Sequence, residues 1–415
     1  MTTRGDGAWW RPTLPAGIWA LGLVSMFMDV SSEMIHALLP VYLVTTLGAS
    51  ALQVGVIEGL AEATASVVKV FSGAFSDWVG RRKLLLVAGY GLGALSKPLF
   101  PLASTASLVL TARFVDRVGK GIRGAPRDAL VGDLALPEAR GAAFGLRQSL
   151  DAAGAFSGPL LAIALMATSG GNVRLVFWVA VVPAMLAVAV LILGVREPPR
   201  ISAVPKARSP IHPEEIRRLG PAYWRVVAVA TVLTLARFSE AFLILRVQDL
   251  GLATTLVPVV LVVMNIVYGL SAYPVGALSD RQGSKGLLCS GFGVLIVADL
   301  VLAFASNLGL ALVGIALWGL HMGMTQGLFA SLVAGTAPDD RRGTAFGVFN
   351  LAGGLALLLA SILAGSFWEA FGGASTFLGG ATITALGLVA ALAILPAQRP
   401  KVVVPSPSQP TQSED

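Results

Sequence analysis

The sequence is poor in charged residues and contains almost no cysteine. Only 13% of its 415 residues are Asp, Glu, Lys or Arg, whereas an average soluble domain has roughly 25%. The single cysteine, Cys289, excludes an intramolecular disulfide and a cysteine-based metal cluster. The chain has no P-loop, dinucleotide-binding fingerprint, metalloprotease helix or nucleophile elbow, so we expect neither an enzyme nor an ATP-driven pump.

Apolar residues make up 55% of the chain instead and recur in long runs. A hydrocarbon core about 30 Å thick needs roughly 20 residues of helix to cross it. We therefore predict an all-α, multi-pass integral membrane protein surrounded by the lipid bilayer. The twelve predicted spans cover residues 17–46, 51–76, 84–103, 106–133, 142–168, 174–195, 223–248, 254–278, 286–305, 308–335, 344–368 and 375–396.

The net charge of +7 is distributed unevenly among the predicted loops. With both termini inside, the outer loops hold only Arg174, with Arg246 near a helix end. This asymmetry predicts a cell (inner) membrane protein with cytoplasmic termini. Because the basic residues follow topology, we expect no nucleic-acid partner, and we expect a monomer. The basic residues counted as cytoplasmic are Arg4, Arg11, Arg81, Arg82, Lys83, Arg140, Arg196, Arg200, Lys206, Arg208, Arg217, Arg218, Arg281, Lys285, Arg341, Arg342, Arg399 and Lys401.

Two motifs recur in the second half of the chain. "GAFSDWVGRRK" from Gly73 returns as "GALSDRQGSKG" from Gly276, and "RGAAFG" from Arg140 returns as "RGTAFG" from Arg342. Both repeats have nearly the same offset, so a duplicated six-helix unit is indicated. The predicted division is an N-terminal bundle at 1–198, a Pro-rich cytoplasmic linker at 199–220, a C-terminal bundle at 221–400 and a disordered cytoplasmic tail at 401–415.

The segment from Gly73 resembles the signature G-x-x-x-D-x-x-G-R-[KR] of the major facilitator superfamily. The resemblance implies twelve transmembrane helices in two pseudo-symmetric six-helix bundles, with a substrate site between them near mid-membrane and transport by alternating access. The matching residues are Gly73, Asp77, Gly80, Arg81 and Arg82, and in the second half Gly276, Asp280 and Gly283.

This motif is predicted to form a cytoplasmic gate. Gly73 permits close helix approach, Gly80 permits a tight turn, and Asp77 can accept hydrogen bonds from a helix N-terminus or a basic side chain. The alternative is a basic loop that only sets topology.

The fifth span resembles the antiporter pattern G-x8-G-x3-G-P-x2-G-G. Ala162 and Ile163 replace its last two glycines, so the match is partial. It favours export, and the alternative is a generic small-residue helix interface. The matching residues are Gly145, Gly154, Gly158 and Pro159.

The fourth span, "TARFVDRVGKG", resembles the family pattern R-x-x-x-x-x-G-x-G, with Arg113, Gly119 and Gly121 in place. The resemblance implies a role for Arg113 in proton coupling. Arg117 stands where drug exporters usually have glycine, which makes a lipophilic cation a less natural substrate.

Ionisable residues form stripes on the predicted spans. Each would cost roughly 2.5 to 3.5 kcal/mol facing lipid, so they must face one another or a wet cavity. They form either a structural ion-pair network or a proton and substrate site. For proton carriers we favour Asp29, Glu33 and Glu58, with Arg113 as their cation. The candidate cavity residues are Asp29, Glu33, His36, Glu58, Glu62, Arg113, Asp116, Arg117, Lys120, Arg147, Asp151, Arg237, Glu240 and His321.

These observations predict a proton-coupled exporter of an anionic or zwitterionic small molecule, without a cofactor and driven by the proton gradient. The alternative is a metal-ion or metal-chelate exporter, because Asp29, Glu33 and His36 share a helix face and could act as ligands. His321 beside Met322 is a lining residue or a further proton candidate. A third alternative is a membrane scaffold or sensor that does not transport.

Overall fold

The computed structural model describes residues 14–79, 81–136, 139–197, 216–282, 284–338 and 342–394. Within these ranges the chain is helical, without strands. The helices of the first half are α1 (Ala16–His36), α2 (Leu39–Val41), the π-helix η1 (Tyr42–Thr46), α3 (Ala51–Val79), α4 (Arg82–Ser96), α5 (Leu99–Leu102), α6 (Ala106–Leu134), α7 (Arg140–Thr168) and α8 (Val173–Gly194).

The second half repeats this layout. Its helices are α10 (Pro221–Ala236), α11 (Ala241–Asp249), the 3₁₀-helix η3 (Thr254–Leu256), α12 (Val259–Gln282), α13 (Ser284–Phe304), α14 (Leu308–Thr336), α15 (Arg342–Phe371) and α16 (Gly373–Ile394). Every predicted span coincides with one long helix or with two or three consecutive helical segments, so the twelve-helix prediction is confirmed.

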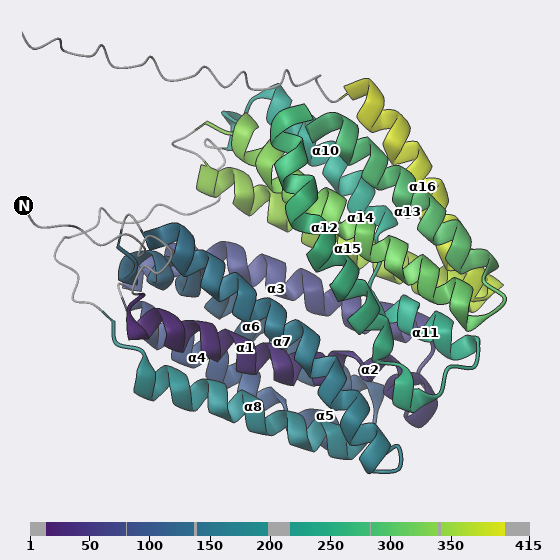
Figure 1. Cartoon of the computed structure of the whole chain (residues 1–415), viewed down its shortest axis with the longest axis horizontal. Coiled ribbons are helices and arrows are strands. Elements are labelled where there is room, and N and C mark those ends of the chain that lie inside the picture. The colour runs from purple at the N-terminus through teal and green to yellow at the C-terminus, as the bar shows by residue number, and fades with distance from the viewer. Residues whose placement is uncertain are drawn as a thin grey trace, which may run out of the picture.

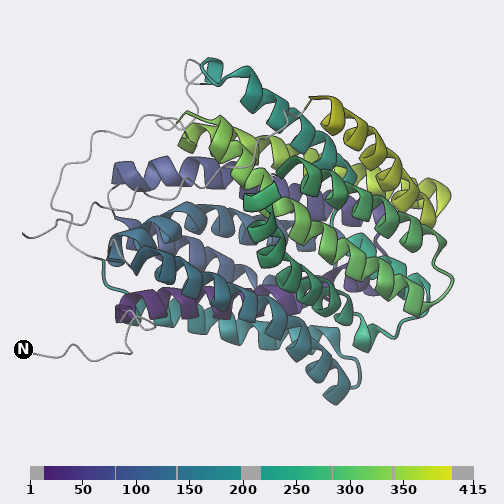
Figure 2. The same cartoon turned by 45° about the horizontal axis from the view of Figure 1, so that its top comes forward.

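The helices gather into two bundles. Figure 1 shows α1 to α8, in purple to teal, below α10 to α16, in green to yellow, and Figure 2 shows the same division from a second direction. Helix α3 of the first bundle packs closely against α15 of the second. A Cβ on Gly59 of α3 would lie 3.0 Å from the Cα of Leu358 of α15. The two-bundle layout predicted from the internal repeat is confirmed.

The duplication extends to how the helices begin. The Thr105 side chain accepts a hydrogen bond from the backbone N–H of Leu108 at the start of α6. Asn307 does the same for Leu310 at the start of α14. Such caps satisfy backbone donors that the first helical turn leaves unpaired.

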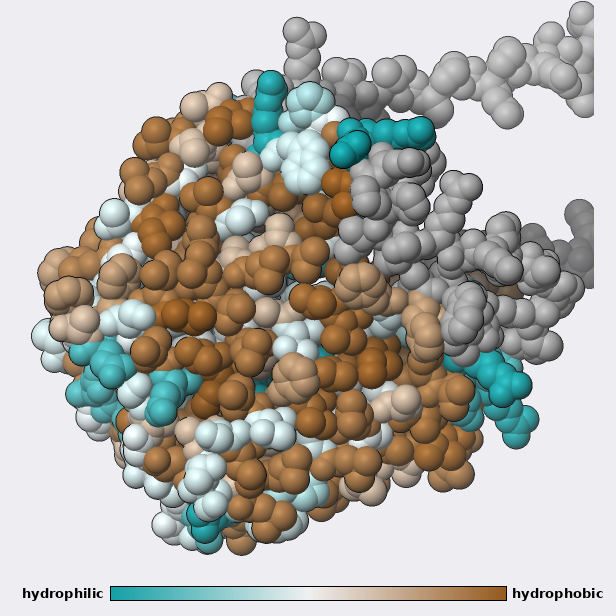
Figure 3. All heavy atoms as spheres, turned by 180° about the vertical axis from the view of Figure 1, so that it is seen from behind, coloured by the Kyte–Doolittle hydropathy of each residue, from teal (hydrophilic) through white to brown (hydrophobic). Residues whose placement is uncertain are grey.

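Ten helical segments in the described part of the chain are long and apolar enough to cross a membrane. Apolar side chains cover most of the face in Figure 3, and hydrophilic ones gather near its ends and edges. Helices α3 and α6 are absent from the ten, yet each has 29 residues and lies among the others. Their charged residues lower their hydropathy, and several of these side chains are buried in protein, namely Glu58, Arg113, Asp116, Arg117 and Arg123.

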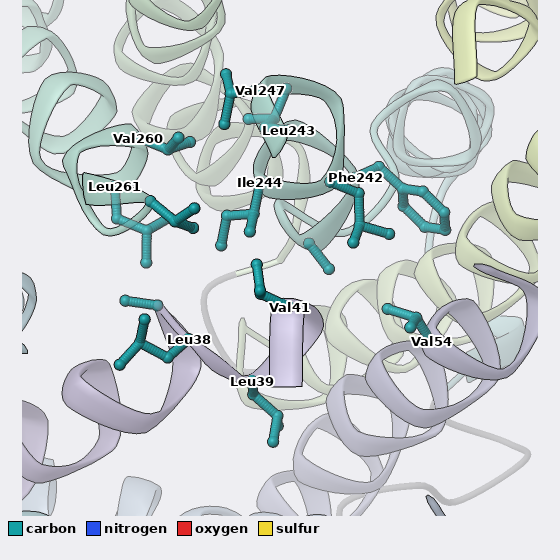
Figure 4. Close-up of a cluster of buried hydrophobic side chains, with 14 of the residues drawn as sticks. Leu38, Leu39, Val41, Val54, Phe242, Leu243, Ile244, Val247, Val260 and Leu261 are labelled. Atoms are coloured by element: carbon teal, nitrogen blue, oxygen red, sulfur yellow. The ribbon is translucent and has the colours of Figure 1, made fainter. Parts of the chain in front are cut away.

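An apolar cluster joins the bundles at the end farthest from the linker. In Figure 4, Leu38 and Val41 lie opposite Ile244 of α11 and Leu261 of α12, and Leu39 points away from α11 in the same buried cluster. All of these side chains are at most 1% exposed. Because they exclude water, this cluster closes the interface between the bundles at that end, next to His36 at the end of α1.

Candidate functional site

Two adjoining cavities lie between the bundles at the level of the charged stripes. One has a volume of about 400 Å³ and is lined by residues of both halves. The other has a volume of about 350 Å³ and shares Glu62, Arg237, Gln326 and Leu357 with the first. Together they form the central cavity of the molecule.

A chain of ionisable side chains runs from this cavity into the N-terminal bundle. Glu33 Oε2 lies 3.5 Å from His36 Nδ1, and His36 Nε2 lies 3.8 Å from Glu58 Oε2. Arg113 donates from Nε to Glu58 Oε1 over 3.1 Å and makes a second ion pair through Nη2. The Glu33 side chain is 27% exposed and that of Glu58 only 1%, so this row of ionisable side chains connects the cavity to the buried Glu58–Arg113 pair.

Other charges of α6 are paired too, but on two different faces. Arg117 Nη2 lies 3.1 Å from Glu62 Oε1, at the cavity. Asp116 instead points toward α4, where Lys97 Nζ donates to it over 2.9 Å and to Ser32 Oγ over 3.0 Å. The prediction that Asp116 lines the cavity is therefore wrong, because its position on the helix turns it toward α4.

Three charged groups of the cavity have no ion-pair partner among the described residues. They are Lys120 on α6, Arg237 in the break between α10 and α11, and Glu240 at the end of that break. Arg237 directly follows the last residue of α10, so the break sets its side chain at the cavity. One unpaired cation thus comes from each half.

Arg147 and Asp151, also predicted to lie in the cavity, belong to a separate cluster between α6 and α7. Arg147 Nη1 donates to Asp151 Oδ2 over 2.8 Å, and Arg127 Nη1 lies 3.7 Å from the same oxygen. Arg127 also donates to Ser25 Oγ over 2.9 Å. Asp151 lines a wide, mostly apolar groove of about 840 Å³ between α7 and α12.

Asp29 lines that groove, which borders the central cavity at Ala155 and Asn265, whereas Glu33 and His36 line the central cavity itself. It precedes His36 by seven residues, which is roughly 10 Å along a helix, whereas metal ligands lie about 2.0 to 2.6 Å from their ion. No group of three His, Cys, Asp or Glu side chains that could hold a metal occurs in the described part of the chain. The alternative metal site at Asp29, Glu33 and His36 is therefore not formed.

His321 lies at the edge of the central cavity and is 3% exposed. Its Nδ1 is 2.8 Å from the carbonyl oxygen of Gly291 on α13, and its ring packs against Phe292. It is thus a lining residue held by a backbone hydrogen bond.

The predicted gate motif lies at the end of the molecule where α8 ends. Arg82 forms an ion pair with Asp133 and donates to the carbonyl oxygen of Ala129 over 2.9 Å. Glu197 accepts from the backbone N–H of Arg82 over 2.6 Å, which satisfies a donor at the start of α4. A Cβ on Gly73 would lie 3.4 Å from Ala125 of α6, whereas nothing lies within 4 Å of Gly276. Gly80, Gly283 and the side chains of Asp77 and Asp280 lie outside the described part of the chain.

The antiporter motif of α7 packs on α1 beside two of the candidate carboxylates. A Cβ on Gly154 would lie 2.7 Å from the carbonyl oxygen of Met26 and 2.9 Å from Asp29 Cβ. On Gly158 it would lie 2.7 Å from Glu33 Cβ, and Pro159 follows within the same helix. Gly145 has nothing within 4 Å of such a Cβ. Two of the three glycines therefore set the distance between α7 and α1.

We expect Gly158→Ala to lower the free energy of unfolding by about 1 to 3 kcal/mol, because the added methyl group meets the Glu33 Cβ and the Val30 backbone. Thermal unfolding of the purified protein in detergent would measure the change. Gly145→Ala is the matched control on the same helix and should leave stability unchanged or slightly raised. Equal effects of the two substitutions would contradict this account of the α1–α7 contact.

The buried ionisable residues that were absent from the predicted site include Lys97 and Asp299. Lys97 lies in the apolar segment "ALSKPLF" and Asp299 in "VLIVADLVLAF". Both are at most 1% exposed. Each is a single charged residue within an apolar span, and this feature of the sequence could have identified them as candidate functional residues.

Comparisons with known proteins agree with this architecture. The sequence profile described as Major Facilitator Superfamily matches residues 21–361 and 237–414. An uncharacterized MFS-type transporter of Methanocaldococcus jannaschii is 30% identical over 362 residues, covering 86% of this chain and 89% of that protein. The crystal structure of a mutant of the nucleoside transporter NupG superposes with a TM-score of 0.77 at 11% identity, covering 91% of this chain and all of that chain. A bacterial homolog of the human lysosomal transporter Spinster, inward-facing and unoccupied, gives a TM-score of 0.71 at 17% identity, covering 91% of this chain and 94% of that chain.

Proposed function

Because this chain belongs to the Major Facilitator Superfamily, we propose that it exports an anionic or zwitterionic small organic molecule in exchange for protons, by alternating access. As a member of the family it is a multi-span membrane transporter. The exchange with protons, the direction and the class of substrate are the proposal.

The observation that carries the substrate class is the pair of unpaired cations in the central cavity. Lys120 comes from the N-terminal bundle and Arg237 from the C-terminal bundle, and both line the same cavity of about 400 Å³. An anionic group between them would receive charge-assisted hydrogen bonds from both halves. Glu240 lines the same cavity and could accept from an ammonium group, so a zwitterion also fits.

The ionisable chain supports proton coupling. Desolvation disfavours the charged form of a buried carboxylate, and a nearby cation favours it. Glu58 has such a cation beside it in Arg113, and His36 lies between Glu58 and Glu33. A proton entering from the cavity can therefore be shared among three titratable groups, and Arg113 compensates Glu58 when the proton leaves.

The basic residues of the predicted loops support an orientation with the linker end in the cytoplasm of the cell (inner) membrane. The apolar cluster at Leu38 and Ile244 would then close the outer side, and substrate would enter the central cavity from the cytoplasm. Alternating access requires that this cluster separate while the halves close at the Gly73 motif. The partial antiporter motif of α7 supports export as the direction.

Counterflow in proteoliposomes tests the proposal. Vesicles are screened with organic anions, zwitterions, lipophilic cations and divalent metal ions, with and without a pH gradient. We expect uptake of an anion or zwitterion that a proton gradient accelerates. Counterflow of lipophilic cations or metal ions alone, without any anion or zwitterion, would contradict the substrate class. If no compound is transported, the scaffold alternative is favoured.

Arg237→Gln and Lys120→Met should each lower the affinity for that substrate roughly tenfold to a hundredfold, because a hydrogen bond to a charged group contributes about 1.5 to 3 kcal/mol. Lys69→Met is the control, since Lys69 is an exposed lysine of α3 that lines neither part of the cavity. Substrate competition in the counterflow assay measures the change. An equal loss in the Lys69 variant would mean that net charge, and not the cavity, causes it.

A further inference from the structure

The C-terminal bundle contains a carboxyl group that the cavity mechanism does not use. Asp299 of α13 is 0% exposed, and neither of its carboxylate oxygens has a hydrogen-bond partner in the described part of the chain. Burying an ionised carboxylate without a partner costs far more than a protein tolerates, and the group takes up a proton instead. We therefore infer that the Asp299 carboxyl group is protonated and neutral in this conformation.

The surroundings of Asp299 connect it to the break between α10 and α11. A Cβ on Gly380 of α16 would lie 2.8 Å from Asp299 Oδ2, 3.1 Å from Phe238 Cε1 and 3.3 Å from the Ala236 carbonyl oxygen. All three groups thus border the same small space. Ala236 is the last residue of α10 and Phe238 lies within the break.

Aromatic rings cover this space. The Phe238 ring centroid lies 5.2 Å from that of Trp318 on α14 and 5.5 Å from that of Phe377 on α16. The Trp318 indole nitrogen is also buried, and no described residue accepts a hydrogen bond from it. An unpaired acceptor and an unpaired donor therefore flank Phe238, whose neighbour Arg237 faces the central cavity.

Among the described side chains of the surrounding helices, no charged group forms a hydrogen bond or an ion pair with Asp299. Arg246 of α11 is engaged by the carbonyl oxygens of Leu302, Ala303 and Ala305 at the end of α13. His321 is bonded to Gly291, and α16 carries no ionisable residue. The remaining charged residues on α10 to α13, with the α10–α11 break, are Arg225, Arg237, Glu240, Asp249, Asp280, Arg281 and Lys285, and none with a described side chain bonds to Asp299.

We propose that Asp299 is a proton-binding site of the C-terminal bundle, opened and closed by Phe238 as the α10–α11 break moves during transport. When Phe238 moves aside, water from the central cavity reaches the carboxyl. The O–H bond then breaks, the proton passes to water, and the carboxylate remains until a proton returns. This inference rests on the proposed proton-coupled transport for its role in the cycle.

Infrared spectroscopy of the purified protein tests the site without any substrate. The wild type should show the C=O stretching band of a protonated carboxylic acid at neutral pH, and the Asp299→Asn variant should lack it. Glu369→Gln removes an exposed carboxylate of α15 and should leave the band intact. Phe238→Ala should expose the group to water, so the band should disappear at a lower pH and exchange faster in D₂O.

Transport supplies the second readout. In Asp299→Asn we expect counterflow without a pH gradient to continue, whereas acceleration by the gradient is lost. The proposed site would be overturned if the wild type and Asp299→Asn had the same C=O band at neutral pH, or if Phe238→Ala left the pH dependence and the D₂O exchange of the band unchanged. Unchanged gradient acceleration in Asp299→Asn would overturn its role in coupling. If the wild type transports nothing, the proposed function fails, and the infrared result still decides whether Asp299 binds and releases a proton.

Discussion

Replacing Arg113 with alanine is expected to lower the free energy of unfolding by about 3 to 5 kcal/mol, because it breaks a buried ion pair. Arg113 is 2% exposed and binds Glu58 through two nitrogens. Its removal leaves Glu58, 1% exposed, with the more distant His36 as its one ion-pair partner among the described residues. A buried charge without compensation is far more costly than an absent pair.

A double-mutant cycle separates the pair from its single members. Glu58→Gln together with Arg113→Gln should cost less than the sum of the single changes, because neither variant side chain leaves a charge unpaired. Chemical unfolding in detergent measures all three, and Arg225→Ala, which removes an exposed arginine of α10, is the control. Additive effects of the two substitutions would mean that Arg113 and Glu58 do not interact.

Gly119→Val is expected to be the most damaging change at a helix contact, lowering the free energy of unfolding by about 3 kcal/mol or more. A Cβ on Gly119 would lie 2.6 Å from the Gly89 carbonyl oxygen and 2.9 Å from the Gly93 backbone nitrogen. These are backbone atoms of α4, which cannot move aside as a flexible side chain can, so the loss lies at or beyond the upper end of the usual range for overpacking.

Separating α4 from α6 would also weaken the polar contacts across the same interface. Lys97 would move from Asp116, and Tyr90 from Arg123, whose guanidinium carbon lies 4.6 Å from the ring centroid. Gly132→Ala is the control in the same helix, since nothing lies within 4 Å of a Cβ there. The yield of monodisperse protein and its thermal midpoint measure the effect. A Gly119→Val protein as stable as Gly132→Ala would contradict the close α4–α6 packing.

The ion pairs bear on the two interpretations of the intramembrane charges. Asp116 and Lys97 join α6 to α4 away from the central cavity, as a structural network would. Lys120, Arg237 and Glu240 line the cavity without ion-pair partners among the described residues, as binding groups would. The paired residues therefore fit the structural interpretation, and the unpaired ones fit the proposed binding role.

The amino-acid sequence by itself determined the twelve helices, the duplication and the family. Apolar run length is a local property, because each helix satisfies its own backbone hydrogen bonds and crosses the bilayer at about 1.5 Å per residue. The repeated motifs from Gly73 and Gly276 needed no coordinates to be recognised. Even the heavily charged α6 was predicted from its place in the repeat, with bounds that agree with Ala106–Leu134.

Only the tertiary structure decided which charges meet. Helical periodicity puts Asp116 beside the stripe of α6, but its partner Lys97 belongs to the preceding helix, and Asp29 is turned into a groove apart from Glu33. Asp299 has no partner at all among the described residues, which no local pattern reveals. The physical reason is that a helix presents several faces, and neighbours distant in sequence determine whether each face meets protein, water or lipid.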